Sequence, residues 1–339
     1  MTDLANDVHQ LRQKFDSCAE SAGLSSINRE ISDISTRIET LGTEIQEVRS
    51  RGYAFRSYLE NKAAVLKNHW SDIRQRVQEA ADEEISSLRT EVKRAEFRFR
   101  RLNDSVAEPE VAAAKEVLEE LENKIDAAEK RIQDMYATLK NDMNATFSQL
   151  HEINWCLDQK DEASFDLLAG ESLFLAAKAE WVASGNSKQD PDGIIFLTDQ
   201  RLIFEQKETT GKRLGLFGGK KEQEVEWALP IHEIDDVSAE NKGFLGGKDM
   251  LYLETSSGKH PRITVEVKGG VDCKFWQKQI QRMISGDTAN ERAIEPDPEL
   301  IEQLRNAPTA CHVCGGTLPR IVAGQLQVDC EYCGAIIRI

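Results

Sequence analysis

The chain has 339 residues and a formal net charge of −16, with 30 % charged and only 6 % aromatic side chains. This length accommodates two or three domains rather than one large core, and the composition is typical of long solvated helices joined to smaller units. The negative charge argues against wholesale binding to nucleic acid or to an anionic membrane, so such binding needs a local basic patch.

The amino terminus lacks a basic segment followed by an apolar one, and no stretch approaches 18 apolar residues. We therefore expect a cytoplasmic protein that contacts a membrane only peripherally. Four of the seven cysteines form two CxxC pairs. This pattern fits a metal site in a reducing compartment better than a secreted disulfide framework.

Residues 1–162 are predicted to form a long antiparallel coiled-coil hairpin. Apolar side chains recur at heptad spacing over 27–102, with one four-residue stutter, so we expect a single helix there. Residues 103–109 contain Asn, Asp, Ser and Pro, which predict the break at the hairpin tip. A second heptad series over 111–157 predicts the returning helix.

The most apolar part of the first helix is the stripe from Ile27 to Val48, and two interpretations of its cover remain open. In the first, the heptad piece 4–22 folds back about Gly23 and covers the stripe, meeting the other returning helix near Gly52. In the second, the stripe pairs with a second chain and produces a homo-oligomer.

Five cations lie within nine residues next to the predicted hairpin tip, with two phenylalanines among them. One interpretation is a solvated face whose arginine stems cover the apolar seam. The other is a basic tip that contacts phosphates or an acidic membrane. The residues of this basic tip are Lys93, Arg94, Arg98, Arg100 and Arg101.

Residues 165–285 are predicted to form a small β-barrel closed by a carboxy-terminal helix. Beyond Lys160 the apolar period falls from 3.5 toward 2, and Gly, Pro, Asp and Asn separate seven candidate strands. An amphipathic helix follows over 275–284. Seven antiparallel strands and one helix are the element order of a PH-type barrel. The strands are expected at 172–183, 193–198, 201–206, 223–229, 231–239, 250–255 and 263–267.

Two stretches of this segment resemble GRAM and bacterial PH-like domains: Leu168-Ala169-Gly170-Glu171, and GIIFLTDQRLIF from Gly193 to Phe204. The resemblance implies a binding module without catalysis. GRAM domains commonly bind phosphoinositides or other lipid headgroups, and many PH-like barrels bind proteins or self-associate. Strand alternation places Leu202 and Phe204 in the core, so we interpret the second stretch as structural.

A short repeat supplies the candidate binding surface of the barrel. The pattern G-apolar-apolar-G-G-K occurs at 215–220 and again at 243–248, each time in an expected loop. Apolar residues in glycine loops with cations around them suit membrane insertion, protein docking or self-assembly, unless the loops merely pack on the coiled coil. The residues of the two loops are Lys212, Arg213, Leu216, Phe217, Lys220, Lys221, Lys242, Phe244, Leu245 and Lys248.

Residues 286–307 are predicted to form a linker with a short helix, and 308–339 resemble a zinc ribbon. Cys311, Cys314, Cys330 and Cys333 form two CxxC pairs separated by 15 residues, the spacing of a four-thiolate zinc site. One structural Zn2+ is therefore expected, because four thiolates leave no open position for catalysis. We expect strands at 318–322, 326–328 and 335–339, and His312 pointing outward.

Together these features predict a multidomain α plus β protein and a non-enzymatic adaptor or scaffold. The barrel would bind a membrane surface or a protein partner, and the ribbon would dock a further protein. The alternative is a self-assembling coiled-coil protein of the membrane-remodelling hairpin type. A nucleic-acid-binding zinc-ribbon regulator is disfavoured, because residues 286–339 carry four basic against eight acidic side chains.

Overall fold

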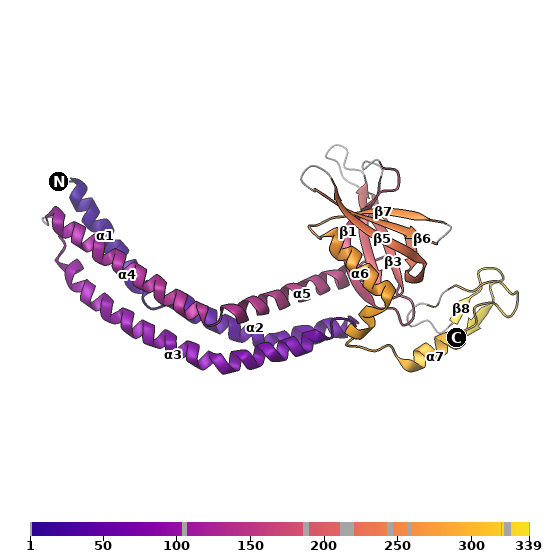
Figure 1. The fold of residues 1–339 in the computed structure, drawn as a ribbon, viewed down its shortest axis with the longest axis horizontal. Helices are drawn as coiled ribbons and strands as arrows, with labels where there is room; N and C mark the ends of the chain where they lie inside the picture. Colours follow the sequence, from indigo (N-terminus) through magenta and orange to yellow (C-terminus); the bar gives the residue numbers. More distant parts are fainter. Residues whose placement is uncertain are drawn as a thin grey trace. The chain divides into compact units, whose positions relative to one another are not determined.

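The computed structural model describes residues 2–103, 107–185, 190–210, 220–242, 247–256, 259–319, 321 and 327–338 (Figure 1). The chain divides into two compact units, one made of Met1–Glu44 and Glu60–Ser148 and the other of Ile45–Leu59 and Gln149–Ile339. The first unit is helical, and the second holds an antiparallel sheet with further helices. The mixed α plus β class predicted from the sequence is present.

The described part of the amino-terminal half contains five helices, where three helical segments were expected, because the segments over 27–102 and 111–157 are each divided, the second at residues 135–136. They are α1 Thr2–Ser21, α2 Ser25–Ser50, α3 Tyr58–Arg101, α4 Glu108–Asp134 and α5 Ala137–Asp161. The expected tip region, 103–109, does separate α3 from α4. No helix in the described part of the chain is long and apolar enough to cross a bilayer.

The prediction of one helix over 27–102 is wrong at residues 51–57. Gly52 takes a φ of +88°, and its N–H donates to the Arg49 carbonyl, while the Tyr53 N–H donates to the Val48 carbonyl. This pair of bonds is a Schellman motif, which ends a helix at a glycine. The Arg49 guanidinium then donates to the carbonyls of Tyr53, Phe55 and Arg56, which fixes the turn.

Helix α1 does not fold back onto α2, contrary to the first interpretation of the apolar stripe. The Phe15 ring stacks on Phe99 at the end of α3, with ring centroids 4.3 Å apart. Asp7 pairs with Lys115 of α4 at 3.0 Å. Because these partners lie on α3 and α4, α1 runs beside α4 and adds a third layer to the predicted hairpin (Figure 1).

The stripe from Ile27 to Val48 is nevertheless covered within the chain. Its apolar residues are all buried. The hydroxyl of Ser35 accepts a hydrogen bond from the Trp70 indole on α3, and Glu30 pairs with Tyr136 and Lys140. The stripe is therefore not an exposed face of this chain.

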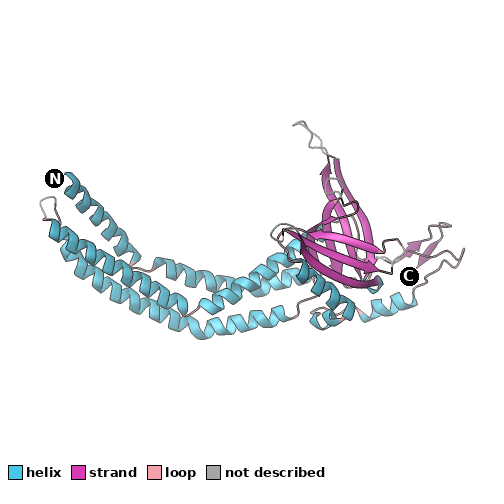
Figure 2. Ribbon diagram, turned by 45° about the horizontal axis from the view of Figure 1, so that its top comes forward, coloured by secondary structure: helices cyan, strands magenta, loops and turns pink. Residues whose placement is uncertain are grey.

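All seven predicted strands are present in one antiparallel sheet, in the order β4-β3-β2-β1-β7-β6-β5 (Figure 2). Leu202, Phe204, Leu251 and Val265 are completely buried, as the expected alternation requires, but Ile203 between the first two is buried as well, so this part of the sheet is covered on both faces. The strands are β1 Leu173–Trp181, β2 Asp192–Thr198, β3 Arg201–Thr210, β4 Lys220–Pro230, β5 Ile234–Lys242, β6 Lys248–Thr255 and β7 Arg262–Val267.

Helix α6, Cys273–Ser285, closes the sheet over β5 and β6. Asp272 caps its start by accepting the Lys274 N–H, and Gly286 ends it with a φ of +80°. Trp276, Ile280 and Met283 are buried, whereas Phe275 and Ile284 at the edges of its apolar face are partly exposed. This helix completes the element order expected of a PH-type barrel.

Gly193 is required where β2 pairs with β3. A Cβ at this position would lie 1.9 Å from the backbone carbonyl oxygen of Glu205, so the two strands would have to separate. We expect Gly193→Ala to destabilise the barrel by about 3 kcal/mol, at the upper end of overpacking costs. Urea unfolding followed by tryptophan fluorescence measures this. Gly42→Ala is the control, since a Cβ at this position of α2 would meet no other part of the fold within 4 Å. An equal loss of stability in both variants contradicts the clash between a Cβ at residue 193 and the Glu205 carbonyl.

Candidate functional site

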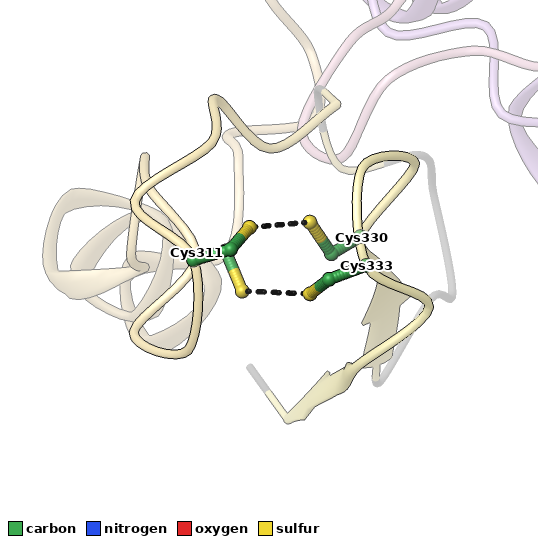
Figure 3. A group of neighbouring side chains, drawn as sticks. Cys311, Cys330 and Cys333 are labelled. Carbon is green, nitrogen blue, oxygen red and sulfur yellow. Dashed lines mark hydrogen bonds between the residues drawn. The ribbon is translucent and has the colours of Figure 1, made fainter.

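The carboxy-terminal segment brings the four predicted metal ligands together. The sulfur atoms of Cys311, Cys314, Cys330 and Cys333 all lie within 4.8 Å of one another. Figure 3 shows Cys330 and Cys333 facing the CxxC turn that holds Cys311. The sulfurs of Cys311 and Cys333 are 3.7 Å apart, and those of Cys314 and Cys330 are 3.5 Å apart. Zn–S bonds of about 2.3 Å in a tetrahedron place sulfurs about 3.8 Å apart. The donor set and its spacing therefore fit a four-thiolate zinc ion.

The two CxxC turns have the same backbone geometry. Gly315 and Gly334 take φ values of +75° and +70°, and their N–H groups donate to the carbonyls of Cys311 and Cys330 at 2.7 and 2.8 Å. Left-handed backbone at these two positions explains why each second cysteine is followed by glycine. The backbone N–H groups of Cys314 and Val313 favour the thiolate of Cys311 and lower its pKa to about 7.

The strands around the four cysteines differ from the expected hairpin. The described pairing joins β8, Gln327–Asp329, to β9, Ile336–Arg338, and a single bridge joins Ala310 to Thr317. Residues 322–326, where part of the predicted hairpin falls, lie outside the described residues. His312 is exposed, as expected. In the linker, the predicted short helix is α7, Pro298–Asn306, capped by Asp297.

The two stretches that carry the predicted resemblance, Leu168–Glu171 and Gly193–Phe204, contribute to a buried ion-pair cluster. The fully buried Glu171 carboxylate receives two hydrogen bonds from the Arg201 guanidinium at 2.8 Å and one from the Thr198 hydroxyl at 2.6 Å. It also accepts the Leu168 N–H. The conclusion that this motif is structural agrees with these contacts, because its polar atoms are engaged with one another.

A second ion pair extends this cluster to the segment between α2 and α3. Asp199 pairs with Arg292 at 2.6 Å, and the Arg292 guanidinium lies 4.8 Å from the centre of the Phe55 ring. Burial raises the pKa of the Asp199 carboxyl, while the Ser172 N–H and Arg292 act in the opposite direction. Phe55 packs edge-on against Phe174. Sequence reasoning did not find this network, although Gly52 in the heptad seam signalled the turn before it.

Two groups on α5 are held in the same region. Glu152 pairs with Arg56, whose φ of +57° is rare for a residue with a side chain. The Cys156 thiol accepts the Ala176 N–H at 3.2 Å, and burial raises its pKa to about 12. A thiol with such a pKa is protonated at neutral pH, so it is not a nucleophile.

Each glycine repeat lies between the two strands of a hairpin at one edge of the sheet. The first repeat connects β3 to β4, and the second connects β5 to β6. Most of their residues lie outside the described part of the chain: Lys212, Arg213, Leu216, Phe217, Phe244 and Leu245, together with the side chains of Lys220 and Lys221. Two cations are described. Lys242 lies 3.4 Å from Glu240 and over the Tyr252 ring, and Lys248 pairs with Glu266 at 2.6 Å, which raises the pKa of Lys248. These two cations are thus partly neutralised by the barrel itself.

The predicted basic tip lies in the last turns of α3. Arg94 pairs with Glu91 at 2.6 Å and Arg100 with Glu96 at 2.5 Å, each pair along the helix. Lys93, Arg98 and Arg101 are exposed as well.

No family model matches the chain, and no curated protein matches it. Among solved structures, a DUF1696 family protein with a pleckstrin-homology domain from Shewanella loihica PV-4 is 23 % identical, over 34 % of this chain and 80 % of its own, with a TM-score of 0.23. The Vps36 N-terminal PH domain is 17 % identical over 35 % and 83 %, with a TM-score of 0.24. The DH/PH domains of PDZ-RhoGEF, in a complex with activated RhoA, are 13 % identical over 84 % and 94 %, with a TM-score of 0.26. These likenesses assign the chain to no family.

Proposed function

We propose that this chain is a non-enzymatic cytoplasmic adaptor. Its barrel binds a membrane surface or a protein partner through the two glycine loops, and its ribbon docks a further protein. The observation that carries the proposal is the filled interior of the barrel, where Phe204, Leu251, Val265 and Trp276 are buried together. A barrel packed in this way binds at its surface and its loops, rather than in an internal substrate cavity.

The described cations on either side of the second repeat bear on which loop would attract a membrane. β4 leads from the first repeat to the corner at Pro230, and β5 leads from that corner to the second repeat. Because Lys242 and Lys248 are engaged with carboxylates, the cations of the first repeat, such as Lys212 and Arg213, would supply most of the attraction to anionic headgroups.

Exposed apolar side chains on the ribbon support protein docking there. Val313 and Tyr332 occupy the same position in the two CxxC turns, and Tyr332 is 71 % exposed. The Tyr332 ring rests on Gly316, where a Cβ would come within 2.5 Å of it, so the ring is held in place. Ile336 is also exposed, whereas Ile337 faces the small core. A positioned aromatic beside aliphatic side chains suits a protein contact.

Vesicle flotation tests the loop assignment. We expect L216S/F217S/F244S/L245S to bind vesicles containing about 30 % phosphatidylserine about tenfold more weakly than the wild type, because four apolar side chains no longer insert. The control F275S/I284S removes two partly exposed apolar side chains from α6 of the same barrel and should bind like the wild type. Equal flotation of wild type and quadruple variant contradicts loop insertion, and a wild type without lipid binding favours a protein partner.

A further inference from the structure

Phe97, near the end of α3, is a large aromatic side chain that the fold leaves in water. It is 67 % exposed, whereas its neighbours on the other face of the helix, Ala95, Phe99 and Leu102, are buried in the bundle. The interpretation in which arginine stems cover this region does not account for Phe97, since the cations around it leave most of its ring uncovered.

Four cations surround Phe97 on the helix surface. Side chains three and four residues apart are neighbours on an α-helix, and at all four such positions Phe97 has a basic residue. The Arg101 guanidinium lies 5.4 Å from the ring centre. Arg94 and Arg100 pair with Glu91 and Glu96 but remain 73 % and 76 % exposed. The four are Lys93, Arg94, Arg100 and Arg101.

The excess of positive charge around Phe97 is confined to the end of α3. Residues 91–103 carry five cations against two carboxylates, in a chain whose net charge is −16. Electrostatic interactions between exposed charges fade over about 8 Å at physiological salt, so distant acidic residues do not cancel this patch. A hollow of about 810 Å³ beside Phe97 is lined in part by Arg98, Arg100, Arg101 and Asn103, with Glu110 as its acidic group.

We propose that this patch, Phe97 with Lys93, Arg94, Arg98, Arg100 and Arg101, binds the anionic headgroups of a phospholipid surface while the Phe97 ring enters the interface. A single aromatic with cations on every side suits a planar anionic surface, where each cation meets a headgroup. An acidic polypeptide is the competing occupant, since the hollow beside Phe97 also has Leu102 and Ala113 in its lining, and the poly-glutamate arm of the test distinguishes it from a lipid surface. The contact is separate from the barrel loops and does not depend on them.

The test compares two triple variants of α3 in the full chain, and both are also placed in the L216S/F217S/F244S/L245S background. F97S/R100Q/R101Q alters the patch. V65S/R74Q/R76Q is the matched control, because Val65 is 57 % exposed and Arg74 and Arg76 are exposed on the same helix. Flotation uses phosphatidylcholine vesicles with or without about 30 % phosphatidylserine, at low and at physiological salt, and thermal melts by circular dichroism check the fold.

We expect the patch variant to bind phosphatidylserine vesicles about tenfold or more weakly in both backgrounds, and the control to match its parent. Binding should weaken as salt is raised. The proposal is overturned if the patch variant floats like its parent, if vesicles lacking phosphatidylserine bind equally well, or if the wild type binds neither. It is also overturned if the patch variant instead loses binding only to poly-glutamate, which would identify an acidic polypeptide. A loop variant that keeps patch-dependent flotation separates this contact from the proposed function of the barrel.

Discussion

Removal of metal from the ribbon is expected to unfold residues 308–338 while the barrel stays folded. Among the described residues of this segment, one buried cluster holds Leu318, Ile337 and two of the cysteines, with Ala335 packed against it, and Val328 is also buried. So few apolar side chains cannot offset the conformational entropy of about thirty residues. Binding of structural zinc to such small units contributes about 10 kcal/mol or more at neutral pH, and that energy is also the folding energy.

Metal analysis of the purified chain should give one zinc per molecule, and a chelator should make the ribbon sensitive to protease. Cys330→Ser removes a buried ligand and should abolish stoichiometric zinc. His312→Ala is the control, since this exposed side chain lies inside the first CxxC turn and is no ligand in the proposed site. Zinc retained by the serine variant, or lost by the alanine variant, contradicts the four-cysteine assignment.

The sequence predicted the seven strands and the two CxxC turns well because both depend on local spacing. Strand alternation and turn residues are set within eight or ten residues, and all seven strands lie where they were expected. A CxxC pair likewise specifies a turn by itself, and the two glycines after Cys314 and Cys333 indicated its backbone conformation. Only the pairing of the two CxxC turns with each other is a tertiary property.

The helical half was predicted less well, since a heptad pattern defines which face is buried but not what covers it. The stripe from Ile27 to Val48 could be covered by the heptad piece 4–22 or by another chain. The stacking of Phe15 on Phe99 decides between these, and no spacing in the sequence encodes it. The helix end at Gly52 carried a signal, a glycine at a seam position, whereas the pairing of Arg56 with Glu152 joins residues almost a hundred positions apart.

The ion pair of Lys248 beside the second glycine repeat is another contact that the sequence pattern does not encode. Lys248 and Glu266 meet because β6 pairs with β7 in a particular register, in which Asp249 lies opposite Val267. A shift of one residue would move the carboxylate to the other face of the sheet. Register follows from the whole sheet, so a lysine beside a glycine loop could be counted from the sequence, but its availability to a ligand could not.

Glu171→Ala is expected to lower the stability of the barrel strongly, because it removes one partner of a buried ion pair. The substitution leaves the Arg201 guanidinium, of which 15 % is exposed, without its carboxylate partner, and it also leaves the Thr198 hydroxyl and the Leu168 N–H without their acceptor. Loss of one partner from a buried ion pair typically costs about 3–5 kcal/mol, so we expect a decrease of about 4 kcal/mol in the free energy of unfolding. Urea unfolding followed by tryptophan fluorescence measures it.

Glu254→Ala is the matched control for this substitution. Glu254 pairs with Arg262 across β6 and β7 of the same barrel, but at 3.4 Å and with both side chains more than half exposed. Exposed pairs of this kind contribute about 1 kcal/mol or less, so the control should unfold close to the wild type. If both variants lose stability equally, the pair of Glu171 and Arg201 stabilises the barrel no more than an exposed pair does. Its residues would then be candidates for binding a ligand. If only Glu171→Ala unfolds early, the contacts of Glu171 with Arg201 and Thr198 stabilise the sheet, and the structural interpretation of this motif stands.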